Sequence, residues 1–210
     1  MKKILLIHSF IKKEFYPDFK MYRAILGRND LSKLMLGCVV KSMESVIYHN
    51  EHIVKHVPWH ERPRFMRDLL SSYRKFYCGD FSSYEASIKT TLMAAELTVY
   101  EHVLDRRAAQ LIKKCLYTTN SMKFAHYGVT MPATRASGDV TTSLGNVLIT
   151  ILVWKYVLMK SGIHIYSLVA EGDDNFVGTN SDDEIDMSLF EKLGLIVKLE
   201  TPMDYNFTIS

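Results

Sequence analysis

The chain contains little cysteine and no long hydrophobic run. Its three cysteines, Cys38, Cys78 and Cys115, are far apart, and none forms a C-x-x-C pair. This spacing gives neither a disulfide framework nor a zinc knuckle, and it favours a reducing, intracellular compartment. Apolar runs such as ILLIHSFI near the start and VLITILVW at 147–154 are far shorter than the roughly 18 to 20 residues that cross a bilayer. We therefore expect no signal peptide and no transmembrane helix.

The remaining composition is that of a globular chain with unevenly distributed charge. Of its 210 residues, 48% are hydrophobic and 23% are charged, which is enough apolar surface for a core and argues against disorder. Residues 1–75 carry a net charge of +8, whereas residues 76–210 carry −5. A basic first part suggests contact with a polyanion and an acidic second part suggests bound cations, although two ordinary solvated surfaces would give the same pattern.

The order of predicted elements indicates an α+β fold. The stretch PWHERPRF, with two prolines around a charged turn, is the best candidate for a boundary. We expect a strand in KFYCGDF from Lys75, one or two helices over 87–116, a turn-rich loop in HYGVTMPATRASGD and a helix over 141–160.

Two strand-like segments, IHIYSLVA and NFVGT, flank the letters EGDD. This pattern predicts a hairpin whose turn carries Asp173 and Asp174. Ser181 is expected to cap a helix that Gly194 ends, and LIVKLE is expected to form a last strand. An antiparallel sheet backed by helices on one face satisfies this order.

Acids at a strand end and at a hairpin turn are the main chemical signal. Asp80 ends the KFYCGD strand, and neighbouring strands of one sheet can bring it to Asp173 and Asp174. Three clustered carboxylates repel one another unless divalent cations neutralise them. Hard oxygen ligands suit Mg²⁺ or Mn²⁺, and two such ions serve phosphoryl transfer. The plain alternative is a pair of solvent-exposed turn residues.

A calcium loop is a second alternative for the same acids. The pattern D-x-N-x-V-G-x5-E, from Asp173 to Glu184, places an acid, an Asn, a Gly and a final Glu as such a loop does. However, Val177 stands where an oxygen ligand belongs, and the preceding segment is strand-like rather than helical. These features argue against an EF-hand.

The stretch ASGDVTTSLGN, residues 136–146, joins a loop to the following helix. Ser137 and Gly138 form a pliable, hydroxyl-bearing loop, whereas Thr142 and Asn146 lie one turn apart on one helix face. Such a pair can hydrogen-bond a sugar hydroxyl. A helix-capping cluster is the alternative, but capping does not require an Asn one turn inside the helix.

In this order, GDFSSYE, SGDVTTSLGN and AEGDDN resemble the palm of RNA-dependent RNA polymerases of positive-strand RNA viruses, nearest to tombusvirus-like and nodavirus-like enzymes. The resemblance covers most of the chain. It implies a ferredoxin-like (RRM-like) antiparallel palm sheet backed by helices, partial fingers over 1–72, a palm over 73–210 and no thumb. It further implies RNA-directed transfer of ribonucleotides to an RNA 3′-hydroxyl by two Mg²⁺ ions, with Mn²⁺ as a substitute.

The resemblance also implies roles for the acids and for one lysine. Asp80 and Asp173 would ligate the metals with Asp174 assisting, and Lys198 would protonate the leaving pyrophosphate. A lysine in an amphipathic strand is otherwise an ordinary solvated residue. The family's second upstream Asp, which helps check the ribose 2′-hydroxyl, is replaced here by Glu85, whose side chain is one methylene longer.

Substrate contacts follow from two further matches. Ser137, Gly138, Thr142 and Asn146 meet the family's SG-xxx-T-xxx-N pattern. YRAILGR resembles the fingers motif P-R-x-I-x-x-R, with a tyrosine in place of the proline. This match implies that the incoming triphosphate is held by Arg23 and Arg28, with Lys20 nearby, although a solvated basic surface is the ordinary alternative.

The implied partners are a viral RNA template, the nascent strand, nucleoside triphosphates and other replication proteins. The implied location is the host cytoplasm, at membrane-associated replication complexes. A reverse transcriptase would share the palm and the paired acids, but it usually has another residue before them and lacks the SG-xxx-T-xxx-N helix. A non-catalytic calcium- or RNA-binding module is the third interpretation.

Overall fold

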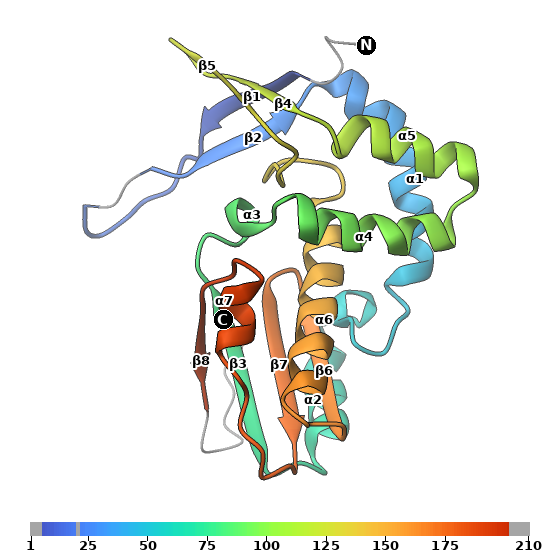
Figure 1. Cartoon of the computed structure of the whole chain (residues 1–210), viewed down its shortest axis with the longest axis vertical. Helices are drawn as coiled ribbons and strands as arrows, with labels where there is room; N and C mark the ends of the chain where they lie inside the picture. Colours follow the sequence, from blue (N-terminus) through green and yellow to red (C-terminus); the bar gives the residue numbers. More distant parts are fainter. Residues whose placement is uncertain (1–5, 20–21, 202–210) are drawn as a thin grey trace. The chain divides into compact units, whose positions relative to one another are not determined.

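The computed structural model describes residues 6–19 and 22–201, and the chain divides into two compact units. Unit 1 consists of Met1–Glu44 and Glu85–Thr142, and unit 2 consists of Ser45–Tyr84 and Ser143–Ser210. Each unit contains one four-stranded sheet, and the described residues form seven α-helices (Figure 1). The predicted α+β class is confirmed.

The sheet of unit 2 is antiparallel throughout, with the strand order β6-β7-β3-β8. Its β6 and β7 form the predicted hairpin, in which Glu171 pairs with Asp174 across a two-residue turn. The strand expected from Lys75 and the last strand are also present. The bounds are β3 (Lys75–Phe81), β6 (Tyr166–Glu171), β7 (Asp174–Thr179) and β8 (Val197–Glu200).

One face of this sheet packs against α6 (Thr142–Lys160) and α7 (Ser188–Lys192), as Figure 1 shows. The ring of Phe190 in α7 meets Trp154 of α6 and Phe81 of β3, with centroids 5.3 and 6.2 Å apart. Helix α6, the helix expected over 141–160, is long and apolar enough to cross a membrane by length and composition. However, 67% of the most apolar stretch of this helix is buried inside the protein, as in the core helix of a globular protein.

The opposite face is covered at one end by α2 (Arg62–Leu70). Leu70 packs on Phe76 and Phe176, whose rings are 5.6 Å apart. Side chains alternate along β3, so Phe76 points away from the α6 face and needs separate cover. The expectation of helices on one face only is therefore wrong.

The sheet of unit 1 has the order β2-β1-β4-β5, with β1 and β4 parallel and the other neighbours antiparallel. A small core of Ile7, Met122 and Ala136 lies against it. The stretch predicted as a loop from His126 to Asp139 contains one short strand, so that prediction is wrong at β5. The bounds are β1 (Leu6–Ile11), β2 (Ala24–Arg28), β4 (Asn120–Lys123) and β5 (Gly128–Met131).

The two helices expected over 87–116 are present as α4 and α5. Asp105 caps α5 by accepting hydrogen bonds from the backbone N–H groups of Arg107 and Ala108. The remaining helical bounds are α1 (Asp30–Ile47), α3 (Tyr84–Ser87), α4 (Thr90–Val103), α5 (Arg106–Leu116) and the 3₁₀ helices Val54–His56 and Trp59–Glu61. The proline-containing stretch separates α1 from α2, but the units divide elsewhere, and a functional boundary after residue 72 stays a prediction.

The helix expected from Ser181 begins only at Ser188. The Ser181 hydroxyl instead donates to Asp183 at 2.9 Å and accepts from its backbone N–H at 3.2 Å, which forms a turn rather than a helix cap. Asp186 accepts from the Ser188 N–H at 2.9 Å, close to where the helix begins. Gly194, with φ +78°, ends the helix as predicted.

A buried ion pair joins Glu96 of α4 to Arg135 in unit 1, and both side chains are almost fully buried. Replacing Glu96 with Gln is expected to lower the free energy of unfolding by about 3–5 kcal/mol, because the Arg135 charge is left without a counterion. Urea unfolding followed by circular dichroism measures the change. The control is Glu101→Gln, which breaks an exposed pair with Lys113 at 3.7 Å and is expected to cost less than about 1 kcal/mol. Equal losses of unfolding free energy in the two variants would contradict a buried ion pair between Glu96 and Arg135.

Candidate active site

The acids of β3 and of the hairpin turn lie at one end of the unit 2 sheet. β3 pairs with β7 up to Gly79↔Asn175, and the same register carried one residue further sets Asp80 opposite Asp174. Directly opposite residues of antiparallel strands share a face, so both side chains lie on the face away from α6. Asp173 precedes Asp174 in the turn. The sheet therefore brings together the two acidic segments that are far apart in sequence.

Electrostatic repulsion is evident at this end of the sheet. Partial removal from solvent is the largest cause of a raised pKa at Asp174, and the charges of Asp173, Glu171 and Asp80 raise that pKa further. Like charges placed opposite one another destabilise a sheet. The site thus holds excess negative charge that a cation would neutralise.

Lys198 of β8 is the register partner of Asp80 on the other side of β3. Its ammonium donates a hydrogen bond to Glu200 at 2.7 Å, and this bond raises the pKa of Lys198, with smaller contributions from the charges of Glu200 and Asp80. Lys198 therefore remains protonated at neutral pH. It places a proton donor in the strand next to the acids.

The turn itself has a defined geometry. Gly172 has φ +68°, and among the described residues Ser83 is the only non-glycine with positive φ, so Asp173 has negative φ. A positive φ at the first central residue alone is the pattern of a type II′ turn. The Thr150 hydroxyl of α6 donates to the Gly172 carbonyl at 2.9 Å and lies 2.8 Å from the Tyr84 hydroxyl. The core helix therefore holds the turn.

Asn175 bonds the turn to β3. Its Oδ1 accepts from the Gly79 N–H at 3.1 Å, and its Nδ2 donates to the carbonyls of Gly79 at 2.9 Å and Asp173 at 2.8 Å. A Cβ at position 79 would lie 2.7 Å from Asn175 Oδ1 and 3.1 Å from Trp154 Cζ2, which explains the glycine there. Because β7 starts at Asp174 and the Asn175 amide bonds backbone groups, the calcium-loop interpretation is wrong.

The donor set suits a divalent cation. Within residues 6–19 and 22–201, no three His, Cys, Asp or Glu side chains stand close enough together to hold a metal ion by themselves. Mg²⁺, however, typically binds through one or two carboxylates and completes its shell with waters and substrate phosphates. Asp80 and Asp174 supply such carboxylates. Partial burial and then the charges of Asp173, Glu171 and Asp80 raise the pKa of Asp174, and a bound ion would neutralise those charges.

A sequence model of the family described as "Viral RNA dependent RNA polymerase" matches residues 38–206. The chain belongs to this family. The matched range is most of the chain and contains Asp80, Asp173, Asp174 and Lys198. A search of curated proteins found no match. The chain is therefore a nucleotidyltransferase of RNA-directed RNA synthesis, which implies an RNA template, nucleoside triphosphates and metal ions.

In this polymerase the SG loop, residues 135–141, is held by β2 within unit 1. Ser137 Oγ accepts from the Leu26 N–H at 3.1 Å, and the Gly138 N–H donates to the Leu26 carbonyl at 2.8 Å. A Cβ at position 138 would lie 2.9 Å from the same carbonyl, so only glycine permits this approach. The Thr142 hydroxyl donates to the Ala136 carbonyl at 2.8 Å, which closes the loop onto α6.

The basic residues predicted to hold the triphosphate differ in exposure. Arg28 is only 3% exposed, and its guanidinium contacts Asp139 at 2.6 Å and Asn120 at 2.9 Å. Burial raises the pKa of Asp139, whereas Arg28 lowers it. The Arg23 side chain is 64% exposed and lies 3.9 Å from Glu14. Lys20 lies outside the described residues.

The last two predicted contacts lie on helices. Glu85 is half-buried in α3 and belongs to unit 1, whereas Asn146 is buried in α6 and belongs to unit 2. The Tyr84 hydroxyl donates to the Asn146 backbone carbonyl at 3.3 Å. Sequence reasoning missed Tyr84, Thr150 and the bonding role of Asn175. Thr150 could have been found from the sequence, because it is a polar residue in a largely apolar helix, one turn after Asn146.

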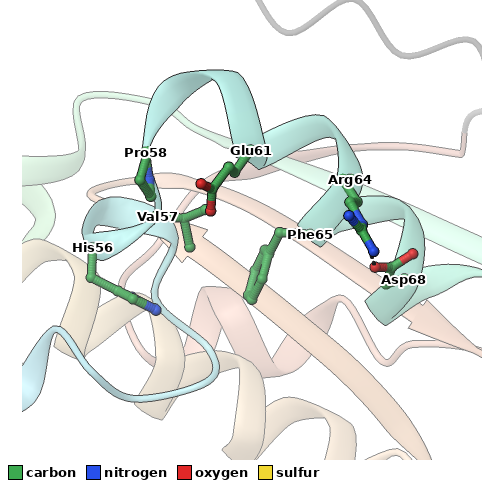
Figure 2. Close-up of a pocket in the computed structure, with 7 residues that line it drawn as sticks. All are labelled: His56, Val57, Pro58, Glu61, Arg64, Phe65 and Asp68. Carbon is green, nitrogen blue, oxygen red and sulfur yellow. Dashed lines mark ion pairs between the residues drawn. The ribbon is translucent and has the colours of Figure 1, made fainter.

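Unit 2 also has a surface pocket that is lined by residues other than those of the predicted site (Figure 2). Arg64 and Asp68 form an ion pair at 3.6 Å on its rim, and the His56 ring meets Phe65 edge-on at 6.3 Å. None of the lining residues is a predicted catalytic or substrate-binding residue. The lining residues are His56, Val57, Pro58, Glu61, Arg64, Phe65 and Asp68.

The raised pKa of Asp174 predicts how stability depends on pH. Because folding raises this pKa, the folded state binds the proton more tightly, so stability falls as pH rises from about 3.9, the ordinary Asp value, through the folded pKa. Asp174→Asn is expected to remove this decline and to raise the Tm of the metal-free protein near neutral pH. Added Mg²⁺ should raise the wild-type Tm more near neutral pH than in acid, since the carboxyl must be deprotonated to bind.

Differential scanning fluorimetry across pH, with EDTA or with Mg²⁺, measures both effects. The control is Asp182→Asn, an exposed acid of unit 2 that lies 3.5 Å from the Lys75 ammonium. A Tm for Asp174→Asn at or below that of Asp182→Asn in EDTA would show that Asp174 is not under repulsion.

Proposed function

We propose that the chain transfers ribonucleotides from nucleoside triphosphates to an RNA 3′-hydroxyl by a two-metal mechanism at the acids of β3 and the β6–β7 turn. The observation that carries this proposal is the register of β3 and β7, which, carried one residue beyond Gly79↔Asn175, sets Asp80 opposite Asp174, the neighbour of Asp173. The family match supplies the reaction class. Viral genome replication and transcription are the corresponding biological roles.

Each acid has a proposed part in the reaction. Two divalent cations, Mg²⁺ or Mn²⁺, would lower the pKa of the attacking hydroxyl and neutralise charge on the leaving pyrophosphate. Asp80 of β3 and Asp173 of the turn would hold these ions, with Asp174 assisting. Lys198, kept protonated by Glu200, donates a proton to the departing pyrophosphate, a step that contributes typically 10²–10⁴-fold.

Substrate recognition is assigned to residues that match the family's motifs. The ribose is bound by Ser137, Gly138, Thr142 and Asn146, and Glu85 contacts its 2′-hydroxyl. The hydrogen bonds that hold the SG loop to β2 support this assignment. Arg23 and Lys20 are proposed to bind the triphosphate. The buried Arg28 contributes by holding Asp139 of the SG loop.

We also propose that unit 2, with the antiparallel sheet, is the palm and that unit 1 belongs to the fingers. The presence of all four predicted catalytic residues in unit 2 supports this division. This division differs from the boundary after residue 72 that is expected from the sequence, because it assigns residues 85–142 to the fingers as well. The similarity to tombusvirus-like and nodavirus-like enzymes, and a location at replication membranes in the host cytoplasm with other replication proteins, rest on the motifs alone.

The test is nucleotide incorporation directed by homopolymer RNA, using the protein expressed from its whole reading frame. A poly(U) template should direct incorporation of AMP only, and a poly(C) template should direct GMP only. Deoxynucleotides should be poor substrates, and EDTA should stop the reaction. Incorporation that ignores the template would contradict RNA-directed synthesis, and a preference for deoxynucleotides would indicate a reverse transcriptase.

A further inference from the structure

We infer that Asn175 is a positioning residue that fixes the β3 end and the hairpin turn relative to each other so that their acids can bind metal. The inference rests on the proposed metal-dependent function and adds a residue that touches neither metal nor substrate. Asn175 is 9% exposed, directly follows Asp174, and points to the sheet face opposite the acids.

The contacts of Asn175 reach both acidic segments. Its amide bonds the N–H and carbonyl of Gly79, the residue before Asp80, and also the carbonyl of Asp173. One side chain therefore fixes the backbone next to Asp80 and at Asp173. An amide is needed, because Oδ1 accepts while Nδ2 donates twice. Aspartate has no donor, and glutamine is one methylene too long for a gap in which a Cβ at position 79 would clash.

This bonding is needed because of where the strand ladder stops. The pairing of β3 with β7 ends at Gly79↔Asn175, so Asp80 and Asp174 stand one residue beyond it. The like charges of these two opposed carboxylates repel each other and destabilise the pairing at this end of the sheet. Ligands must be held to within about 0.5 Å for efficient binding and catalysis. The amide of Asn175 supplies the restraint that the ladder does not.

Asn180 is a matched control at the other end of β7. Its Oδ1 accepts from the Arg74 N–H at 2.8 Å, and its Nδ2 donates to the Ser72 carbonyl at 2.8 Å. It thus connects β7 to the chain before β3 with the same amide chemistry. Replacing either asparagine with alanine removes backbone bonds from the same strand pair, but only Asn175 lies next to the acids.

The test is Mn²⁺ binding measured by electron paramagnetic resonance of the free ion, at a temperature where every variant is folded by circular dichroism. Asn175→Ala is expected to weaken Mn²⁺ binding by about tenfold or more, in line with other residues that orient metal ligands. Asn180→Ala is expected to stay within about twofold of the wild type, even where its Tm falls as much. Should Asn175→Ala not fold, Asn175→Ser replaces it, because the short hydroxyl cannot bond both segments.

The outcomes separate this inference from the proposed function. Wild-type protein that binds Mn²⁺, together with an Asn175 variant of unchanged affinity, overturns the positioning role alone. Equal weakening in the Asn175 and Asn180 variants also overturns it, since the effect would then be one of general stability. Wild-type protein that binds no Mn²⁺ refutes the metal site itself and the positioning role with it.

Discussion

Asp173→Asn is expected to lower the rate of RNA synthesis by about a thousandfold or more. Asn keeps the size and the turn-forming tendency of Asp but removes the charge that we propose holds a divalent cation. The charge stabilisation supplied by such an ion is worth several kcal/mol in the transition state, and each 1.36 kcal/mol is a factor of ten in rate. Incorporation of a labelled nucleotide on a defined template measures the loss.

Asp182→Asn is the matched control for this variant. Asp182 is an exposed acid of the same unit, paired only loosely with Lys75 at 3.5 Å, and its loss should leave the rate within about twofold of the wild type. Circular dichroism should show both variants folded. Synthesis by Asp173→Asn at more than a tenth of the wild-type rate would exclude a metal-binding role for this acid.

Asp80→Asn is expected to have a comparable effect, although this residue is far from Asp173 in the sequence. The register of β3 and β7 places the two segments at the same end of the sheet, and loss of either acid should disable the proposed site. The double variant Asp80→Asn with Asp173→Asn should then be no slower than the slower single variant, because groups that act as a unit are not additive.

Steady-state rates of the two single variants and the double variant, at saturating Mg²⁺, test this cycle. Rate losses that multiply would mean that Asp80 and Asp173 act independently. A rate near that of the wild type for Asp80→Asn would show that Asp80 of β3 does not take part in the reaction.

Local patterns predicted the elements that carry the site. The strand-like segments IHIYSLVA and NFVGT around EGDD were enough to locate the hairpin, and the apolar run over 141–160 was enough to locate α6. These signals depend on neighbours in sequence. The register of β3 with β7, which decides whether Asp80 meets Asp174, depends on residues about a hundred positions apart and needed the structure.

The misses have the same physical cause. Asn175 was considered as a calcium ligand, but its amide partners are the backbone of a strand 96 residues away. Arg28 was predicted to bind a triphosphate because YRAILGR resembles a fingers motif, yet it is buried against Asp139, 111 residues distant. At Ser181 a local turn replaced the helix cap, since the same hydroxyl chemistry serves both. Nothing within a few residues distinguishes these outcomes.

The most direct test of the account is the site of backbone cleavage by bound iron. Fe²⁺ can occupy sites that bind Mg²⁺ through oxygen ligands, and with ascorbate and peroxide it produces hydroxyl radicals that cut the nearby chain. The account predicts cuts close to both Asp80 and Asp173, located by mass spectrometry and suppressed together by excess Mg²⁺. Cuts near only one of these acids, or cuts that Mg²⁺ does not suppress, would contradict a single metal site shared by β3 and the hairpin turn.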